Sequence, residues 1–104
     1  MRHVERMYIV RAVSKNLSSR NDIKKRMHKI FWKLYGENEK LISKYEKLGN
    51  DEMIDFLFNI LLEYAYYRAT ISLIKDGYNV EYIIEDLTDL KNKIKKHYDE
   101  VICK

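Results

Sequence analysis

The sequence predicts an all-α protein, a small antiparallel helical bundle of about four helices. The 104-residue chain contains no proline and only three glycines, so few positions interrupt a helix. Gly49 and Gly77 are each followed within two residues by Asn and then by acidic residues, the pattern of one helix ending and the next beginning. We therefore expect a single helical domain, residues 1–104, with helices over about 3–15, 20–48, 51–76 and 80–102.

The first of these segments has two readings. Its apolar residues, Met7 to Val10 and Val13, are largely β-branched or aromatic, so they also suit a β-strand. A lone strand would need a partner from another chain. We therefore prefer a helix over 3–15.

The second segment carries one apolar stripe, and Gly36 marks a possible kink or break near its middle, so it could be two helices. The stripe consists of Ile23, Met27, Ile30, Leu34, Leu41, Tyr45 and Leu48.

The last two segments have different apolar patterns. Segment 51–76 is apolar on most of its circumference, so it must be covered on more than one side. Segment 80–102 repeats apolar residues at alternating spacings of three and four, a coiled-coil type of seam. This seam is Val80, Ile83, Leu87, Leu90, Ile94, His97 and Val101. Because such faces exceed what one copy can cover, we expect a homodimer through one of these two helices.

Positive charge is concentrated at the start of the chain. Ten Lys and Arg lie in the first 36 residues against two acids, Glu5 and Asp22, which gives a formal charge of +8 there. The run Lys24, Lys25 and Arg26 falls in the opening turn of a predicted helix, where the macrodipole disfavours cations. Helix stability alone does not explain this placement, so we expect the cations to contact a polyanion.

The second segment therefore supplies a candidate nucleic-acid-binding surface. On a helical wheel Trp32 lies opposite Ile23, on the side that carries Lys25 and Lys29. Cations neutralise phosphates and aromatic rings stack on unpaired bases. The candidate binding residues are Arg20, Lys24, Lys25, Arg26, His28, Lys29, Trp32 and Lys33.

Two other interpretations of this surface remain open. Segment 3–15 could pack over Trp32 and Tyr35 while the lysines extend around the contact. Residues 18–22 could also form the turn of a helix-turn-helix motif. However, this turn lacks glycine, and the recognition helix that follows it would be unusually long.

Enzymatic chemistry has little support. His3, His28 and His97 belong to different predicted helices, and none has the carboxylate three residues earlier that di-metal bundle sites use. Glu63 is one acid in an apolar helix, and we expect it to be exposed or paired with Arg68 or a tyrosine. We expect Cys103 to be an exposed, unreactive thiol. We predict no enzyme activity, no cofactor and no metal.

Composition favours a cytoplasmic protein. A single cysteine cannot form an internal disulfide, and the longest apolar stretch is interrupted by charges that a bilayer would reject. We expect no membrane contact. Enrichment in Lys, Glu and Ile resembles thermophile proteins, although seven Asn weaken that likeness.

The leading functional hypothesis is a non-enzymatic helical accessory protein that contacts nucleic acid through its basic N-terminal third. The alternative is a protein-interaction module, such as an inhibitor, immunity factor or assembly subunit. Its binding surface would be the tyrosine-rich middle of the chain, since tyrosine is enriched at interfaces.

Overall fold

The computed structural model describes residues 21–101, and residues 1–20 and 102–104 lie outside the described part. Within it the chain forms four helices and no strand: α2 (Asn21–Glu37), α3 (Glu39–Lys47), α4 (Asp51–Lys75) and α5 (Val80–Val101). The predicted all-helical class is therefore confirmed for this part. The expected helix over 3–15, its strand alternative, Arg20 and Cys103 all lie outside the described residues.

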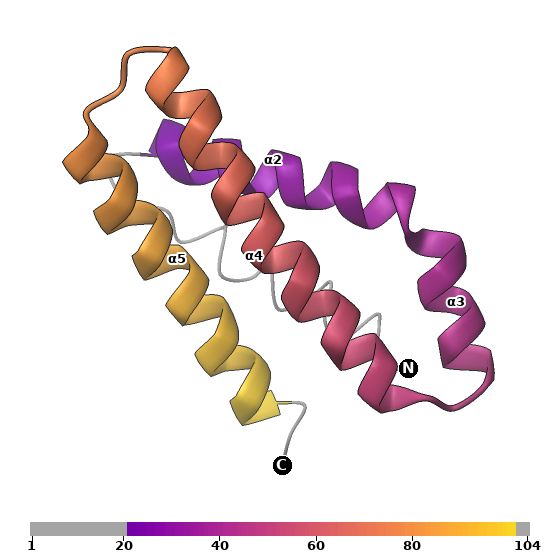
Figure 1. Ribbon diagram of the computed structural model, residues 1–104. Coiled ribbons are helices and arrows are strands. Elements are labelled where there is room, and N and C mark those ends of the chain that lie inside the picture. Colours follow the sequence, from indigo (N-terminus) through magenta and orange to yellow (C-terminus); the bar gives the residue numbers. More distant parts are fainter. Residues whose placement is uncertain (1–20, 102–104) are drawn as a thin grey trace.

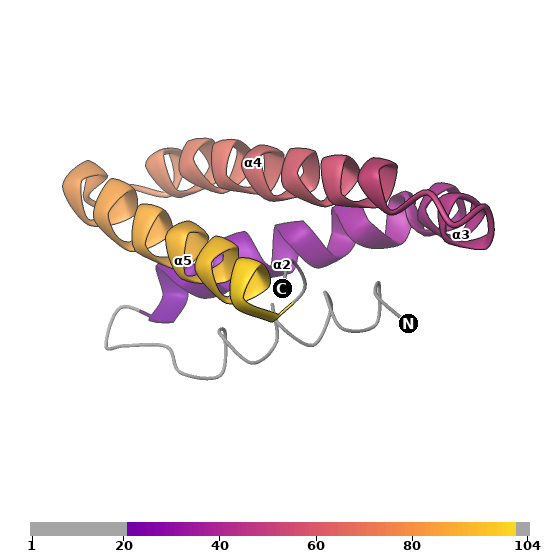
Figure 2. The same ribbon diagram turned by 90° about the horizontal axis from the view of Figure 1, so that it is seen from below.

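The helices are arranged around an antiparallel pair. α4 and α5 lie side by side in opposite directions, and α2 crosses the pair obliquely (Figure 1). The shorter α3 leads from the end of α2 back to the start of α4. Seen from below, α4 forms one layer, and both α2 and α5 lie on the same side of it (Figure 2). One long face of α4 therefore points away from the other described helices.

The helix ends follow the predicted pattern. Gly49 and Gly77 adopt positive φ angles of 68° and 85°, which glycine reaches without the strain of a side chain. After each, a backbone N–H bonds back across the last turn, from Asn50 to Tyr45 at 2.9 Å and from Tyr78 to Leu73 at 3.1 Å. The Asn50 side chain then accepts the Met53 amide at 3.1 Å and caps α4. Asn79 caps α5 in the same way, through the amides of Glu81 and Tyr82.

The second predicted segment is two helices, and the break is at Asn38 instead of Gly36. The Asn38 side-chain amide donates to the Leu34 carbonyl at 2.8 Å, which competes with continuation of the helix. Gly36 lies inside α2. The short α3 therefore leaves at a new angle, and it buries Ile42 instead of the predicted Leu41.

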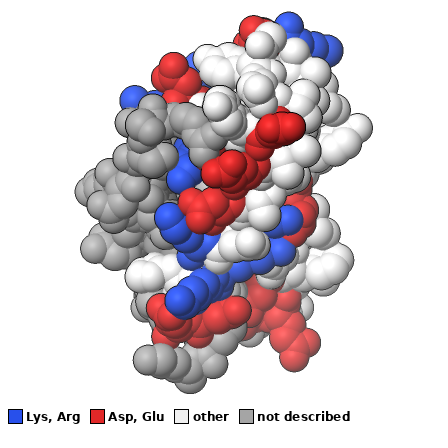
Figure 3. Space-filling model, turned by 90° about the vertical axis from the view of Figure 1, so that its left-hand side faces the viewer, with Lys and Arg blue, Asp and Glu red and all other residues white. Residues whose placement is uncertain are grey.

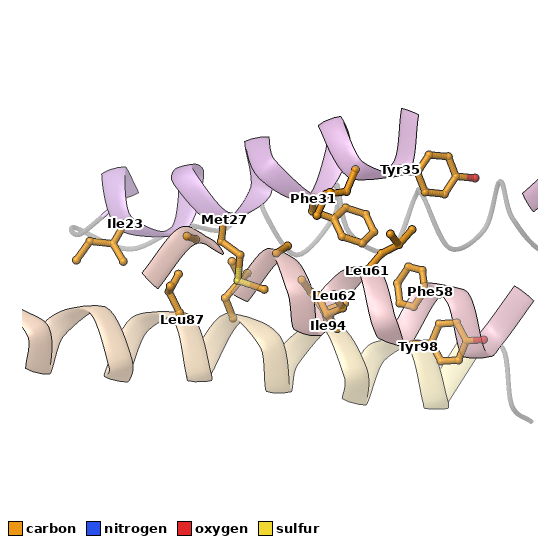
Figure 4. Close-up of a cluster of buried hydrophobic side chains, with 14 of the residues drawn as sticks. Ile23, Met27, Phe31, Tyr35, Phe58, Leu61, Leu62, Leu87, Ile94 and Tyr98 are labelled. Carbon is orange, nitrogen blue, oxygen red and sulfur yellow. The ribbon is translucent and has the colours of Figure 1, made fainter. Parts of the chain in front are cut away.

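The core lies where α2 meets α4 and α5. Side chains from the three helices point toward one another in Figure 4, among them Met27 and Phe31 of α2, Leu62 of α4 and Leu87 of α5. Phe31 stands edge-on to Phe58, with ring centroids 5.6 Å apart, and Phe58 stacks on Tyr98 at 5.1 Å. Packed aromatic rings thus join all three helices.

Two sequence assignments of buried faces need correction. In α2 the predicted residues Ile23, Met27 and Leu34 are buried and Ile30 packs partly buried against the core, but the buried face is wider than predicted and also includes Phe31 and Tyr35. In α5, Tyr98 is buried in place of His97, which is partly exposed, and Val80 at the start of the predicted seam is exposed. The Tyr98 hydroxyl donates to the Asp55 carboxylate of α4, so a tyrosine can occupy this position with its polar atom satisfied.

Candidate interaction surfaces

Two of the predicted nucleic-acid-binding cations are neutralised inside the fold. Lys24 is buried, and its Nζ donates to Asp89 Oδ2 of α5 at 3.0 Å. Arg26 reaches α4, where it donates to Ser72 Oγ at 2.5 Å and pairs with Asp76 at 2.8 Å. Both cations therefore tie α2 to its neighbouring helices.

Three lysines remain together on the solvent side of α2. Lys25, Lys29 and Lys33 are spaced four residues apart and all are exposed, so they form one row along the helix. Among residues 21–101 none of the three makes an ion pair. We call them the lysine row.

Trp32 and His28 lie on the same helix and bind each other. The Trp32 indole N–H donates to His28 Nε2 at 2.6 Å, and the indole ring also meets the rings of Phe31 and Tyr35 edge-on. Trp32 is half-buried and packs against the core. Its ring is thus part of an aromatic cluster and not a separate stacking platform.

Charges of both signs share the face that Figure 3 shows. Acidic and basic side chains lie next to one another over this side of the molecule, where α5 is at the front. One cluster of mixed charge surrounds Glu63 of α4, whose carboxylate accepts hydrogen bonds from Lys95 Nζ at 2.5 Å and from Lys91 Nζ at 3.3 Å. The hydrogen bond from Lys95, reinforced by Lys91, holds the pKa of the Glu63 carboxyl below its ordinary value. Glu63 is exposed, which was one of the expected outcomes, and it pairs with lysines of α5 and not with Arg68.

Asp89 has a similar environment. The hydrogen bond from Lys24, followed by that from Lys93 at 3.1 Å, holds the pKa of the Asp89 carboxyl below its ordinary value. Both perturbed carboxylates thus join one helix to another, and their pKa shifts have a structural cause.

The outer face of α4 carries the largest exposed apolar feature of the described chain. Its side chains recur at spacings of three and four, so they form one continuous strip along the helix. We call this strip the outer row. It consists of Phe56, Ile60, Tyr64, Tyr67, Ile71 and Ile74.

The outer row lies opposite the side of α4 that forms the core. The buried residues of α4, such as Phe58, Leu62 and Ala65, lie on the other half of the helical wheel. Near the end of the row, Val80 and Ile84 at the start of α5 are also exposed. Uncharged surface is most continuous at the upper right of Figure 3, where the end of α4 is seen from the side.

Between residues 21 and 101, no group of three or more His, Cys, Asp or Glu side chains could hold a metal ion. Nor is any helix in that range long and apolar enough to cross a bilayer.

Comparison with family models, with curated proteins and with solved structures finds no match to this chain.

The structure brings together only part of the predicted site. Lys25, Lys29 and Lys33 share one face, Lys24 and Arg26 are used in packing, and Arg20 lies outside the described residues. The outer row was not identified from the sequence, although the apolar circumference of segment 51–76 was its signal. That pattern does not say which face is buried and which is exposed, because apolar residues occupy most of the circumference of the helix.

Proposed function

We propose that this chain is a non-enzymatic protein-interaction module whose docking surface is the outer row of α4. The main observation in support is that six large apolar side chains on one face of α4 are 37% to 60% exposed. With aromatic side chains of about 150–250 Å² each, the row leaves roughly 600 Å² of side-chain surface open. A typical soluble monomer has a largest apolar patch of about 300–600 Å², and patches of that size or larger often mark binding sites.

The composition of the row supports a protein partner. Tyr64 and Tyr67 lie at its centre, and tyrosine buries a large area while it loses few rotamers. The rim is charged, with Glu63 on one side and Arg68 on the other. An apolar centre with a polar rim is the usual organisation of a protein interface.

Site-specific photo-crosslinking in the native host tests this function. A photoreactive phenylalanine analogue replaces Tyr67 in one variant and Tyr82 of α5, which is also about half exposed, in the control. We expect a discrete protein adduct from position 67 and none from position 82. Equal labelling at the two positions, or no adduct at 67, would contradict the proposal.

The lysine row supports a second candidate, weak contact with nucleic acid. Three unpaired cations in line can follow a phosphate backbone. If these three dominate, affinity should fall roughly twentyfold to fortyfold between 50 and 200 mM salt.

Filter binding of single- and double-stranded DNA and RNA measures this effect. The double variant Lys25→Glu and Lys29→Glu should abolish retention. Lys75→Glu with Lys96→Glu changes the net charge equally on α4 and α5 and should retain binding. Equal loss in both double variants would show that net charge, and not the row, causes the retention.

A further inference from the structure

We infer that the occupant of the outer row is the outer row of a second copy, in antiparallel orientation, so that the chain is a two-fold symmetric dimer. This inference rests on the proposed docking function and specifies its partner. It is argued from the order of the side chains along α4, the area they expose and the distribution of charge along the helix.

The side-chain order is self-complementary. Reversal about a midpoint between Tyr64 and Tyr67 places Tyr64 of one copy level with Tyr67 of the other. The same reversal places Ile60 level with Ile71, and Phe56 within one residue of Ile74. The spacings of four, three, four and three from Ile60 to Ile74 are those of a coiled-coil seam, whose side chains interlock when two helices pair. A row that matches its own reverse is what an isologous two-fold interface requires.

The area suits a small, symmetric interface. A stable complex buries about 800 Å² on each partner, whereas the outer row alone exposes roughly 600 Å². Val80 and Ile84 of α5 are also exposed, a few residues after the end of the row in the sequence.

Charge along α4 favours the antiparallel orientation. The first half of the helix carries only acids, of which Glu52 and Glu63 lie beside the outer row, whereas Asp51 and Asp55 lie on the core side. Its second half carries Arg68 and Lys75. Antiparallel pairing places the acidic half of one copy beside the basic half of the other and opposes the two helix macrodipoles. Parallel pairing would place the two acidic halves together.

Sedimentation equilibrium of the purified full chain between 1 and 100 µM tests the inference. We expect a concentration-dependent approach to twice the chain mass. Tyr67→Glu places a carboxylate at the centre of the interface and should weaken dimerisation by at least about thirtyfold, whereas Tyr67→Phe should not. Leu48→Glu alters an apolar residue at the end of α3 that is 68% exposed and should leave the dimer unchanged. Circular dichroism checks that each variant is folded.

Cysteine cross-linking tests the orientation. In a Cys103→Ser background, proteins carrying Ile60→Cys and Ile71→Cys are mixed and oxidised. Antiparallel pairing predicts a disulfide between the two different variants, since like positions lie about 16 Å apart along the pair, beyond disulfide reach. Disulfides only between like positions would overturn the antiparallel arrangement.

A chain that stays monomeric at 100 µM would overturn self-pairing. If position 67 still captures a different protein by photo-crosslinking, the docking function survives with another partner. If position 67 captures nothing, both proposals fail.

Discussion

The ammonium group of Lys24 is held at the edge of the core by Asp89. The Lys24 side chain is only 6% exposed, while that of Asp89 is 44% exposed and also meets Lys93. A buried ammonium group without its carboxylate partner has lost most of its hydration, and no ion pair compensates for that loss. The carboxylate, in contrast, remains in contact with water and with a second lysine if Lys24 is removed.

This asymmetry gives a prediction for two single variants. Asp89→Ala should lower the free energy of unfolding by about 2 kcal/mol, because it leaves the buried cation unpaired. Lys24→Met keeps the packing and removes the buried charge, so it should cost no more than about 1 kcal/mol. Urea unfolding followed by circular dichroism at pH 7 measures both. A larger cost for Lys24→Met than for Asp89→Ala would contradict this view of the pair.

Glu63 predicts how stability depends on pH. Its folded pKa is held below the ordinary value of 4.5 by Lys95 and Lys91, so the folded state binds this proton less readily than the unfolded state. The stabilisation is therefore complete above the unfolded pKa and is lost as pH falls through the folded pKa. Because Glu63 is about half exposed, the effect should not exceed about 1 kcal/mol.

Urea unfolding at pH 7 and at pH 2.5 tests this dependence. Glu63→Gln should be less stable than the wild type at pH 7, and the difference should disappear at pH 2.5. A difference of the same size at both values would show that the carboxylate charge is not its cause.

At the scale of the helices, Gly77 and Gly36 differ in backbone conformation. Gly77 ends α4 with φ at 85°, whereas Gly36 lies in the helical turns of α2 and has no atom within 4 Å of where a Cβ would stand. A side chain at Gly77 would be strained, and one at Gly36 would only reduce the freedom of the unfolded chain.

Alanine substitution at the two positions should therefore act in opposite directions. Gly36→Ala should raise the free energy of unfolding by about 0.5–1 kcal/mol. Gly77→Ala should lower it by about 1–2 kcal/mol. Thermal unfolding monitored at 222 nm compares the two variants. A stabilising Gly77→Ala would contradict the assigned helix end.

The helix ends could be predicted from the sequence because their causes are local. Gly49 with Asn50, and Gly77 with Asn79, contain both the left-handed glycine and the capping side chain. The possible break in segment 20–48 was placed two residues too early, at Gly36, because glycine is the commoner signal, whereas the side-chain amide of Asn38 bonds back to Leu34.

The candidate site depended on contacts that local sequence does not specify. Asp89 lies 65 residues after Lys24, and Asp76 lies 50 residues after Arg26, so only the packing of α2 on the other helices reveals their pairing. Likewise, Phe31 is more deeply buried than Ile30, because α2 packs against both α4 and α5. Of the predicted nucleic-acid-binding cations in the described residues, only the three of the lysine row are exposed.

At the scale of the whole molecule, the core and the proposed docking surface lie on opposite sides of α4. One side of it forms the centre of the core and the other side carries the outer row. A face of that size exposed to water favours association, because pairing removes apolar surface from solvent on both copies at once. A dimer built on this face would also carry two copies of the lysine row.

Hydroxyl-radical footprinting of the tyrosines most directly tests whether the outer row is covered in solution. Oxidation of Tyr64 and Tyr67 is compared between 1 and 100 µM full-length protein, with Tyr82 of α5 as the internal reference. We predict that both row tyrosines become protected several-fold relative to Tyr82 as the concentration rises. Unchanged reactivity of Tyr64 and Tyr67 across this range would contradict pairing through α4.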